Sequence, residues 1–218
     1  MKLALIGVGN AGARIVDEIV SFEQKADRPC SYGNSLVINT DSDVFDSLSS
    51  VSRFRRVLIG DTFHDVRGSG VGGDVELGVA VANEEKNELH RALDDIEMYN
   101  LDATLLVTGF GGGTGSGVGS VLLDELQTMY EKPVYTLGVL PEQSADKRRI
   151  LNAARGIKTM VPMADNVFLF DNSTWFSDDA TDEENHAAAN AALAERIVSL
   201  FGTGENDDLE IPSTCVDA

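Results

Sequence analysis

The sequence predicts an α/β fold, a Rossmann-like, doubly wound and mostly parallel sheet of six strands. Three observations predict it. Six short apolar runs alternate with stretches of helical periodicity. Most of these runs are apolar throughout, which is typical of parallel strands covered on both faces. Glycine-rich turns join strand to helix at two places, and such strand–helix–strand repetition implies right-handed crossovers between parallel strands.

The expected strands follow the apolar runs in chain order. They are Leu3–Ile6, Leu36–Asn39, Arg56–Ile59, Ala103–Thr108, Val134–Val139 and Val167–Phe170. The loops after them begin at Gly7, Asn39, Gly68, Gly109, Leu140 and Asp171. All six loops therefore lie at the carboxyl edge of the sheet, where folds of this kind bind ligands. Helical spacing is clear after the first and fourth strands, and again over about 183–201, before the helix stop Gly202-Thr203-Gly204.

The most informative segment is Gly109-Phe110-Gly111-Gly112-Gly113-Thr114-Gly115-Ser116-Gly117, between the fourth strand and its helix. Glycines let backbone N–H groups converge without a Cβ between them, and the helix N-terminus adds partial positive charge. Thr114 and Ser116 can also donate their hydroxyls to phosphate oxygens. The segment is therefore expected to bind phosphate.

A second loop of this kind, Gly7-Val8-Gly9-Asn10-Ala11-Gly12, follows the first strand. Taken singly, its G-x-G-x-x-G pattern also opens dinucleotide-binding folds, or serves only tight packing of helix on strand. Two phosphate-type loops in one domain are much harder to explain by packing alone.

These residues resemble a known family. GGGTGSG at 111–117 looks like the signature of the tubulin/FtsZ superfamily, and GVGNAGARIVD at 7–17 resembles its first nucleotide loop, especially in the archaeal CetZ branch. The resemblance covers essentially the whole chain in the expected order. It implies a GTP-binding, GTP-hydrolysing cytoskeletal protein that polymerises head to tail into protofilaments. The resemblance further implies GTP or GDP and Mg²⁺ as cofactors, and control of cell shape or division in a haloarchaeon as the role.

By this resemblance, several loops surround the phosphates of the nucleotide. The residues implied are Gly9, Asn10, Ala11 and Arg14 from the first loop, and Gly111, Gly112, Gly113, Thr114, Gly115 and Ser116 from the fourth. The loop Gly68–Asp74 resembles the segment that senses the γ-phosphate, through Gly70, Gly72 and Gly73. The alternative for Asn10 is a helix N-cap, and both roles can hold together.

Asp41, in Asn39-Thr40-Asp41, is expected to assist Mg²⁺ through water, because this ion keeps much of its water shell. No side chain is expected to ligate the metal directly. The alternative is that the three residues form only a turn.

The base and ribose contacts are carried over in the same way. Asn172 and Asn190 stand where relatives place asparagines against guanine. His186, four residues before Asn190 and on the same helix face, replaces the aromatic residue of relatives. Glu142 and Arg149 are the candidates for the ribose contact, within an alignment that is ambiguous by several positions.

Composition and charge narrow the class of protein. The chain has 218 residues, 43% of them hydrophobic, and a net charge of −19, so it is globular and acidic. Because a nucleic-acid binder would be basic, that class of partner is disfavoured. The charge favours a halophilic protein, in which molar salt screens the self-repulsion. The alternative is an ordinary acidic protein.

Neither cysteine chemistry nor a membrane location is indicated. Cys30 and Cys215 are far apart and lie near no metal-binding pattern. The chain opens on an expected core strand and has no apolar stretch approaching 18 residues, so we expect neither a signal peptide nor an integral membrane segment, and a cytoplasmic location. Whether an adaptor links the protein to a membrane stays open.

The resemblance also divides the chain. Residues 1–204 are expected to form the GTP-binding domain, with the long helix included. Residues 205–218 are expected to begin a catalytic loop, which relatives follow with an activation domain that this sequence does not contain. In the family, an acidic loop resembling N-x-D-x-x-D acts on the nucleotide of the next subunit. Asp217 matches its first acid, with Cys215 in place of Asn, so Asp217 is the candidate catalytic residue, acting in trans.

Two other functions compete with this one. A Rossmann NAD(P)-dependent oxidoreductase would use only Gly7–Gly12, and it leaves GGGTGSG unexplained. A nucleotide-binding regulator of the same fold would bind the nucleotide without polymerising.

Overall fold

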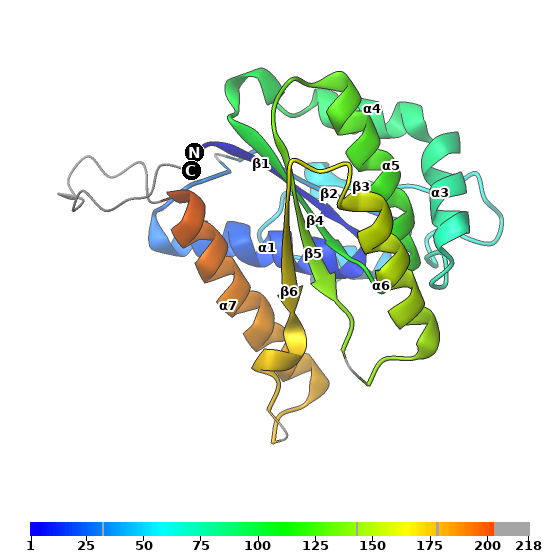
Figure 1. Cartoon of the computed structure of the whole chain (residues 1–218). Helices are drawn as coiled ribbons and strands as arrows, with labels where there is room; N and C mark the ends of the chain where they lie inside the picture. Colours follow the sequence, from blue (N-terminus) through cyan, green and yellow to red (C-terminus); the bar gives the residue numbers. More distant parts are fainter. Residues whose placement is uncertain (32, 143, 178, 203–218) are drawn as a thin grey trace.

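The structure, a computed structural model, describes residues 1–31, 33–142, 144–177 and 179–202 (Figure 1). Its strands are β1 (Leu3–Val8), β2 (Ser35–Asn39), β3 (Arg56–Leu58), β4 (Ala103–Gly109), β5 (Val134–Leu140) and β6 (Asn166–Asp171). They form one sheet in the order β3-β2-β1-β4-β5-β6, and every neighbouring pair is parallel. The predicted α/β fold with six parallel strands is confirmed.

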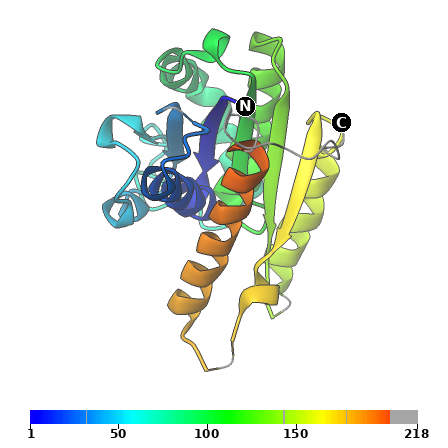
Figure 2. The same ribbon diagram turned by 90° about the vertical axis from the view of Figure 1, so that its left-hand side faces the viewer.

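Helices cover both faces of this sheet. They are α1 (Gly9–Ala26), α2 (Asp43–Ser47), α3 (Val75–Glu84), α4 (Lys86–Asp94), α5 (Gly113–Met129), α6 (Lys147–Met160) and α7 (Asp182–Gly202), with short 3₁₀ turns at Arg53–Arg55, Met98–Asn100 and Asn172–Trp175. Figures 1 and 2 show α1 and α7 on one face of the sheet and α3 to α6 on the other.

The inner strands β1, β2, β4 and β5 are largely buried on both faces, as their unbroken apolar runs predict, whereas the edge strands β3 and β6 are partly exposed. Within β1, Ala4, Ile6 and Val8 join the core beneath α3 to α6. Leu3 and Leu5 join the second core, beneath α1 and α7. The sheet therefore separates two hydrophobic cores and holds the carboxyl ends of its strands in fixed register.

The chain changes direction in the sheet between β1 and β4. From β1 it proceeds outward through β2 to β3, and then crosses back to β4, which pairs with the other side of β1. The register places Val8 of β1 opposite Thr108 of β4. The glycine loops after these two strands therefore start side by side, at the switch point where doubly wound sheets bind ligands.

Part of the first glycine loop serves packing rather than a ligand. A Cβ at Gly12 would lie 2.2 Å from the carbonyl oxygen of Val107 in β4, so only glycine lets α1 approach the sheet this closely. Gly9 is different, since its φ of +73° is a backbone conformation that favours glycine. The structural and the ligand-directed interpretations of G-x-G-x-x-G thus apply to different glycines of the same loop.

Of the two cysteines, Cys30 is a buried free thiol, and Cys215 lies outside the described residues. Burial and the neighbouring Glu23 carboxylate raise the pKa of the Cys30 thiol far above its usual range. Glu23 itself accepts hydrogen bonds from the backbone N–H groups of Cys30 and Ser31 at 2.9 and 2.8 Å. The pair therefore closes the turn between α1 and β2.

Most of the acidic residues lie at the surface. Within the described part of the chain, the buried ones are Asp17, Glu23 and Glu125. Each is hydrogen-bonded: Asp17, for example, accepts from the backbone N–H groups of residues 49 to 51. The excess negative charge is thus spread over a solvated surface, where dissolved salt screens it.

We therefore expect the stability of the ligand-free chain to depend on salt. Mutual repulsion of surface carboxylates acts over the Debye length, which shrinks from about 10 Å at 0.1 M salt to about 3 Å at 1 M. Raising KCl from a dilute buffer to molar concentration should raise the melting temperature by roughly 5 °C or more. Thermal unfolding followed by circular dichroism measures it, and a melting temperature that is flat across this range would favour an ordinary acidic protein.

Candidate functional site

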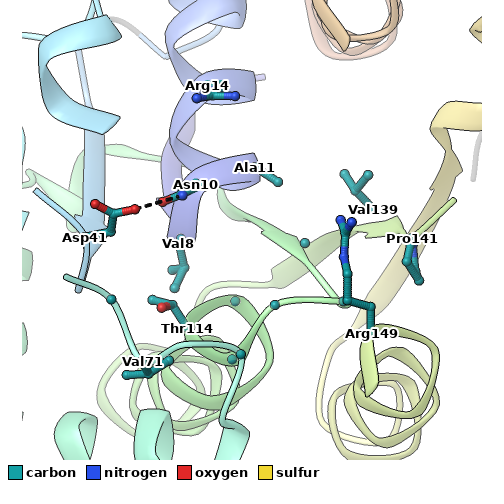
Figure 3. A pocket seen from close by; sticks show the side chains of 18 of the residues that line it. Val8, Asn10, Ala11, Arg14, Asp41, Val71, Thr114, Val139, Pro141 and Arg149 are labelled. Carbon is teal, nitrogen blue, oxygen red and sulfur yellow. Dashed lines mark hydrogen bonds between the residues drawn. The ribbon is translucent and has the colours of Figure 1, made fainter. Parts of the chain in front are cut away.

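The loops at the carboxyl edge of the sheet enclose a cavity of about 470 Å³. A volume of this size is usual for a site that holds a small organic ligand. Its lining comes from the ends of β1, β4 and β5 and from the starts of α1, α5, α6 and α7 (Figure 3). The strand ends thus converge on one site, as the doubly wound topology predicts.

The start of α5 supplies a set of hydrogen-bond donors to this cavity. Gly112 is the N-cap of α5, and Gly113, Thr114 and Gly115 form its first turn. The first N–H groups of a helix have no partner within it, and they lie at its positive end. All four residues line the cavity. An anion placed here would receive hydrogen bonds from the first N–H groups of α5, whereas the N–H of Gly112 already donates to Gly109 O at 3.4 Å.

A polar network fixes the first loop against the end of β2. Asn39 donates to the side-chain oxygen of Asn10 at 2.6 Å, and Asn10 donates to Asp41 at 3.1 Å (Figure 3). The hydroxyls of Thr40 and Thr114 lie 2.7 Å apart. The N-cap alternative for Asn10 is wrong, because α1 begins one residue earlier, at Gly9. Asn10 instead connects the first loop to Asp41.

The third loop closes the cavity beside α5. Gly70, Gly72 and Gly73 all line it, and all have positive φ, at +77°, +58° and +80°. Asp74 is the N-cap of α3, and its carboxylate accepts a hydrogen bond from Leu77 N–H at 3.0 Å. The backbone N–H groups of residues 71 to 73 donate no hydrogen bond within the described part of the chain. They are therefore available to a ligand.

The segment that leads into the third loop is itself anchored. The carboxylate of Glu85 accepts from the N–H groups of Gly60 and Thr62 at 2.7 and 3.1 Å. Burial raises the pKa of Glu85, but these hydrogen bonds outweigh it and hold the pKa below its usual range. Glu85 is therefore a charged anchor for the chain between β3 and the third loop.

Amide groups lie at another part of the lining. Asn172 follows β6, while His186 and Asn190 project from α7. Asn172 is buried, and its side-chain oxygen has no hydrogen-bond partner in the described structure. A buried amide oxygen without a partner is uncommon, and here it belongs to a residue that lines the cavity. It is thus a position at which a donor on a ligand would be stabilised.

His186 is held by two neighbours. Its Nε2 lies 3.4 Å from Oε1 of Glu142, which follows β5. The ring of Phe176 packs edge-on to its imidazole, with the centroids 5.1 Å apart. The histidine that replaces the usual aromatic residue is therefore oriented, and Glu142 reaches it across the cavity.

Arginines balance the carboxylates in the lining of the cavity, although the molecule as a whole is acidic. Arg14, Arg148 and Arg149 line the cavity together with the carboxylates of Asp41, Glu142 and Asp146. The lining is thus close to neutral, although the chain carries −19. Figure 3 shows Arg14 projecting from α1 and Arg149 from α6, on opposite sides of the cavity.

Most residues proposed from the sequence come together in this lining. Those that line the cavity are Gly9, Asn10, Ala11, Arg14, Asp41, Gly70, Gly72, Gly73, Gly111, Gly112, Gly113, Thr114, Gly115, Glu142, Arg149, Asn172, His186 and Asn190. The shared lining is a geometric fact; the contact that each residue makes with a nucleotide remains a proposal.

Ser116 does not join them. It is 2% exposed, and its hydroxyl donates to the carbonyl oxygen of Phe110 at 2.5 Å. Its backbone N–H donates to Gly112 O. With both donors engaged, Ser116 fixes the shape of the loop rather than facing the cavity, and the expectation that its hydroxyl reaches phosphate does not fit this geometry. The candidate catalytic Asp217 lies outside the described residues.

The sequence reasoning missed several lining residues. They are Val8, Ile15, Val139, Leu140, Pro141, Asp146 and Arg148, while Ser69, Val71 and Gly109 lie in loops that the sequence had already singled out. The apolar members carry no chemical signature that a sequence pattern could reveal. Arg148 and Asp146 had one, because they flank the start of α6 at the carboxyl edge of the sheet. Asp146 is the N-cap of α6 and accepts from Arg149 N–H at 2.9 Å.

Neither a membrane span nor a preformed metal cage is found in the part of the chain that the structure describes. No helix there has the length and apolar character needed to cross a bilayer. No group of three or more His, Cys, Asp or Glu side chains there is placed to hold a metal ion.

Comparison with known proteins agrees with this architecture. Residues 2–178 match the tubulin/FtsZ family, GTPase domain. The tubulin-like protein CetZ3 of Haloferax volcanii is 40% identical over 207 residues, which cover 95% of this chain and 52% of the relative. CetZ1 of the same organism is 37% identical over the whole chain and 55% of its own length. The chain thus spans about half the length of the curated relatives it matches.

Solved structures give the same result in three dimensions. A GDP-bound monomer of CetZ1 from Haloferax volcanii has a TM-score of 0.88 at 37% identity, covering 93% of this chain and 61% of that one. A GTPγS-bound protofilament of CetZ2 from the same organism has a TM-score of 0.87 at 36% identity, covering 94% of this chain and 59% of the other.

Proposed function

We propose, from the premise that this chain belongs to the tubulin/FtsZ family, that its cavity binds GTP or GDP and that the protein hydrolyses GTP within a head-to-tail protofilament. Residues 1–204 would form the GTP-binding domain, and residues 205–218 would begin the catalytic loop. An acidic, salt-dependent protein of the cytoplasm fits this role. One part of the cavity lining presents backbone N–H groups, which suit phosphates, and another presents the amides of Asn172 and Asn190, which suit a base. This difference supports the assignment of a nucleotide to the cavity.

The observation that carries the proposal is the amide oxygen of Asn172, which has no partner in the described structure and belongs to a cavity that Asn190 also lines. Other loops of this cavity present backbone N–H groups. The edge of guanine carries donors that an amide oxygen can accept, and adenine offers a different pattern. Phosphates would lie against the starts of α1 and α5, where helix N-termini favour negative charge. Arg14 and Arg149 would add charge from the two sides.

Mg²⁺ is proposed as a companion of the nucleotide. Asp41 lines the cavity, where its Oδ2 accepts from Asn10 and its Oδ1 from the N–H of Asp43. Each carboxylate oxygen keeps a second lone pair, so Asp41 fits a contact to the ion through water. Bound there, Mg²⁺ would neutralise charge that develops on the phosphates. Asn10 and Asn39 hold the Asp41 carboxylate in place for this contact.

Polymerisation is proposed from membership of the family. Contacts between unlike faces of identical subunits give open filaments. The solved structure of CetZ2 is a GTPγS-bound protofilament, and it shares this fold closely. A nucleotide-binding regulator that does not polymerise is the second candidate. Nucleotide-dependent sedimentation in molar KCl separates the two, since only a polymer pellets with GTP and disperses with GDP.

Base recognition leads to the first test of the proposal. Asn190→Ala removes an amide from the cavity wall, which contributes about 1 kcal/mol, or up to about 3 if the partner group is left buried and unpaired. The dissociation constant for GDP should therefore rise by about five- to a hundredfold. Isothermal titration calorimetry in molar KCl measures it, with ADP as the competing nucleotide.

Asn83→Ala is the matched control, because the Asn83 amide bonds only to Val79 O of its own helix and is exposed. This variant should bind GDP as the wild type does. Equal wild-type affinity for GDP and ADP, or an Asn190→Ala variant with unchanged GDP affinity, would contradict the assignment of guanine recognition to this wall.

A further inference from the structure

The third loop, Gly68–Gly73, is pinned at both of its ends but by different parts of the fold. At its beginning, Gly70 N–H donates to Thr40 O at 2.9 Å, and Ser42 donates to Gly68 O through its backbone N–H and its hydroxyl. These contacts tie it to the turn after β2. Its other end, at Gly73, is held from the opposite side of the cavity by α6.

The contact at Gly73 is made by Asn152, in the middle of α6. Its Nδ2 donates to Gly73 O at 2.9 Å and to Gly111 O at 3.2 Å. Asn152 is 3% exposed, so this amide is dry. One buried side chain thus uses both of its donor hydrogens to join the third loop to the fourth loop.

Arg148, one helical turn before Asn152, covers the same glycine. A Cβ at Gly73 would lie 2.7 Å from Arg148 Nη2, so the guanidinium lies directly over it. Gly113, at the start of α5, packs equally closely, since a Cβ there would lie 2.6 Å from Asp74 N. The end of the third loop is therefore confined between α5 and α6. The two hydrogen bonds of Asn152 fix the distance between Gly73 of the third loop and Gly111 of the fourth loop.

We propose that Asn152 is a positioning residue that sets the distance between the third and fourth loops and thereby lets the site distinguish a nucleoside triphosphate from a diphosphate. This inference rests on the proposed function for its ligand. The N–H groups of residues 71 to 73 have no partner in the described structure. They can donate hydrogen bonds to a terminal phosphate only when the third loop is held at the correct distance from the fourth loop. A diphosphate, in this proposal, is bound by the first and fourth loops alone.

The test compares Asn152→Asp with Asn83→Asp, which adds the same charge at an exposed asparagine that lies outside the cavity lining and bonds to Val79 O of its own helix. Asn152→Asp replaces the amide nitrogen, which donates to Gly73 O and Gly111 O, with a carboxylate oxygen, which can only accept hydrogen bonds. Affinity for GTPγS should fall about tenfold more than affinity for GDP, the scale on which a buried hydrogen bond acts. If Asn152→Asp does not fold, Asn152→Ala, which only deletes the donor, gives the same comparison.

A second readout needs no nucleotide. Hydrogen–deuterium exchange of the ligand-free variant should become faster at residues 68–74 and 109–113 and stay unchanged in β1 and α1. A wild-type chain that binds neither GDP nor GTPγS overturns the proposed function and the discriminating role with it. Binding of both nucleotides by the wild type, with an equal loss for the two in Asn152→Asp or with unchanged exchange at the loops, overturns this inference alone.

Discussion

Gly112→Val is expected to abolish nucleotide binding while leaving the fold as stable as before. Gly112 has φ −91° and ψ 156°, an extended conformation that any residue adopts. A Cβ there would meet nothing closer than Gly109 O at 3.9 Å. The protein itself therefore does not require glycine at this position.

The ligand requires it instead. Gly112 is exposed and lines the cavity at the N-terminus of α5, so a branched side chain would stand where a phosphate oxygen approaches the helix. Affinity for GDP should fall by about a hundredfold or more, because the phosphate loses several N–H contacts together. The melting temperature without ligand should change little, since valine is a poor N-cap but also restricts the unfolded chain.

A matched control exists in the same chain. Gly202, at the end of α7, also has ordinary φ and an open Cβ direction, with its nearest neighbour at 4.0 Å, and it lies outside the cavity lining. Gly202→Val should bind GDP as the wild type does. Calorimetry measures the GDP affinity, and thermal unfolding the melting temperature, of the wild type, Gly112→Val and Gly202→Val. Tight GDP binding by Gly112→Val would show that the fourth loop does not bind phosphate.

The contrast between Gly112 and Gly12 explains why the fold was easier to predict than the site. Both belong to motifs that the sequence singles out. Gly12 must be glycine because a side chain there would collide with Val107 O of β4, whereas a side chain at Gly112 would meet no protein atom closely and would instead enter the space proposed for phosphate. The spacing of apolar residues shows which side chains are buried, and that spacing differs between strands and helices, so it predicts both. A motif does not report which of its glycines faces a ligand.

The residues that sequence reasoning missed or misplaced share a physical cause. Ser116 carries the right hydroxyl, but a turn of helix rotates it towards Phe110 O. Asn152 resembles any helical asparagine until the crossover after β5 brings α6 over Gly73 and Gly111. Both roles depend on tertiary direction, whereas Asn190 and His186 could be paired from their spacing on one helix face.

The proposed trans mechanism is supported by where α7 ends. His186 and Asn190 of α7 line the cavity, and from Asn190 to Gly202 the helix extends roughly 18 Å at 1.5 Å per residue. The amino group of Met1, just before β1, donates to Phe201 O at 3.1 Å. The end of α7 therefore lies at the amino edge of the sheet, opposite its own cavity, as Figure 1 also shows.

Hydrolysis is therefore expected to depend on contact between subunits. At low concentration the chain should bind GTP and turn it over very slowly, and turnover per chain should rise as the concentration rises. Asp217→Ala should lower the assembled rate by about a hundredfold or more, the usual effect of losing a group that activates the attacking water. Phosphate release under saturating GTP in molar KCl measures both.

A complementation experiment with variants of the whole protein distinguishes catalysis in trans from catalysis in cis. Gly112→Val keeps the acid at 217 but should not bind nucleotide, and Asp217→Ala keeps the cavity but lacks the acid. Each variant alone should be nearly inactive. Mixed, they should recover turnover, because the acid of one variant meets the nucleotide of the other, whereas positioning within a single subunit would allow no recovery. A Gly112→Val/Asp217→Ala double variant is the helper control and should restore nothing. Fast turnover independent of concentration would place the catalytic group within the same subunit as the nucleotide.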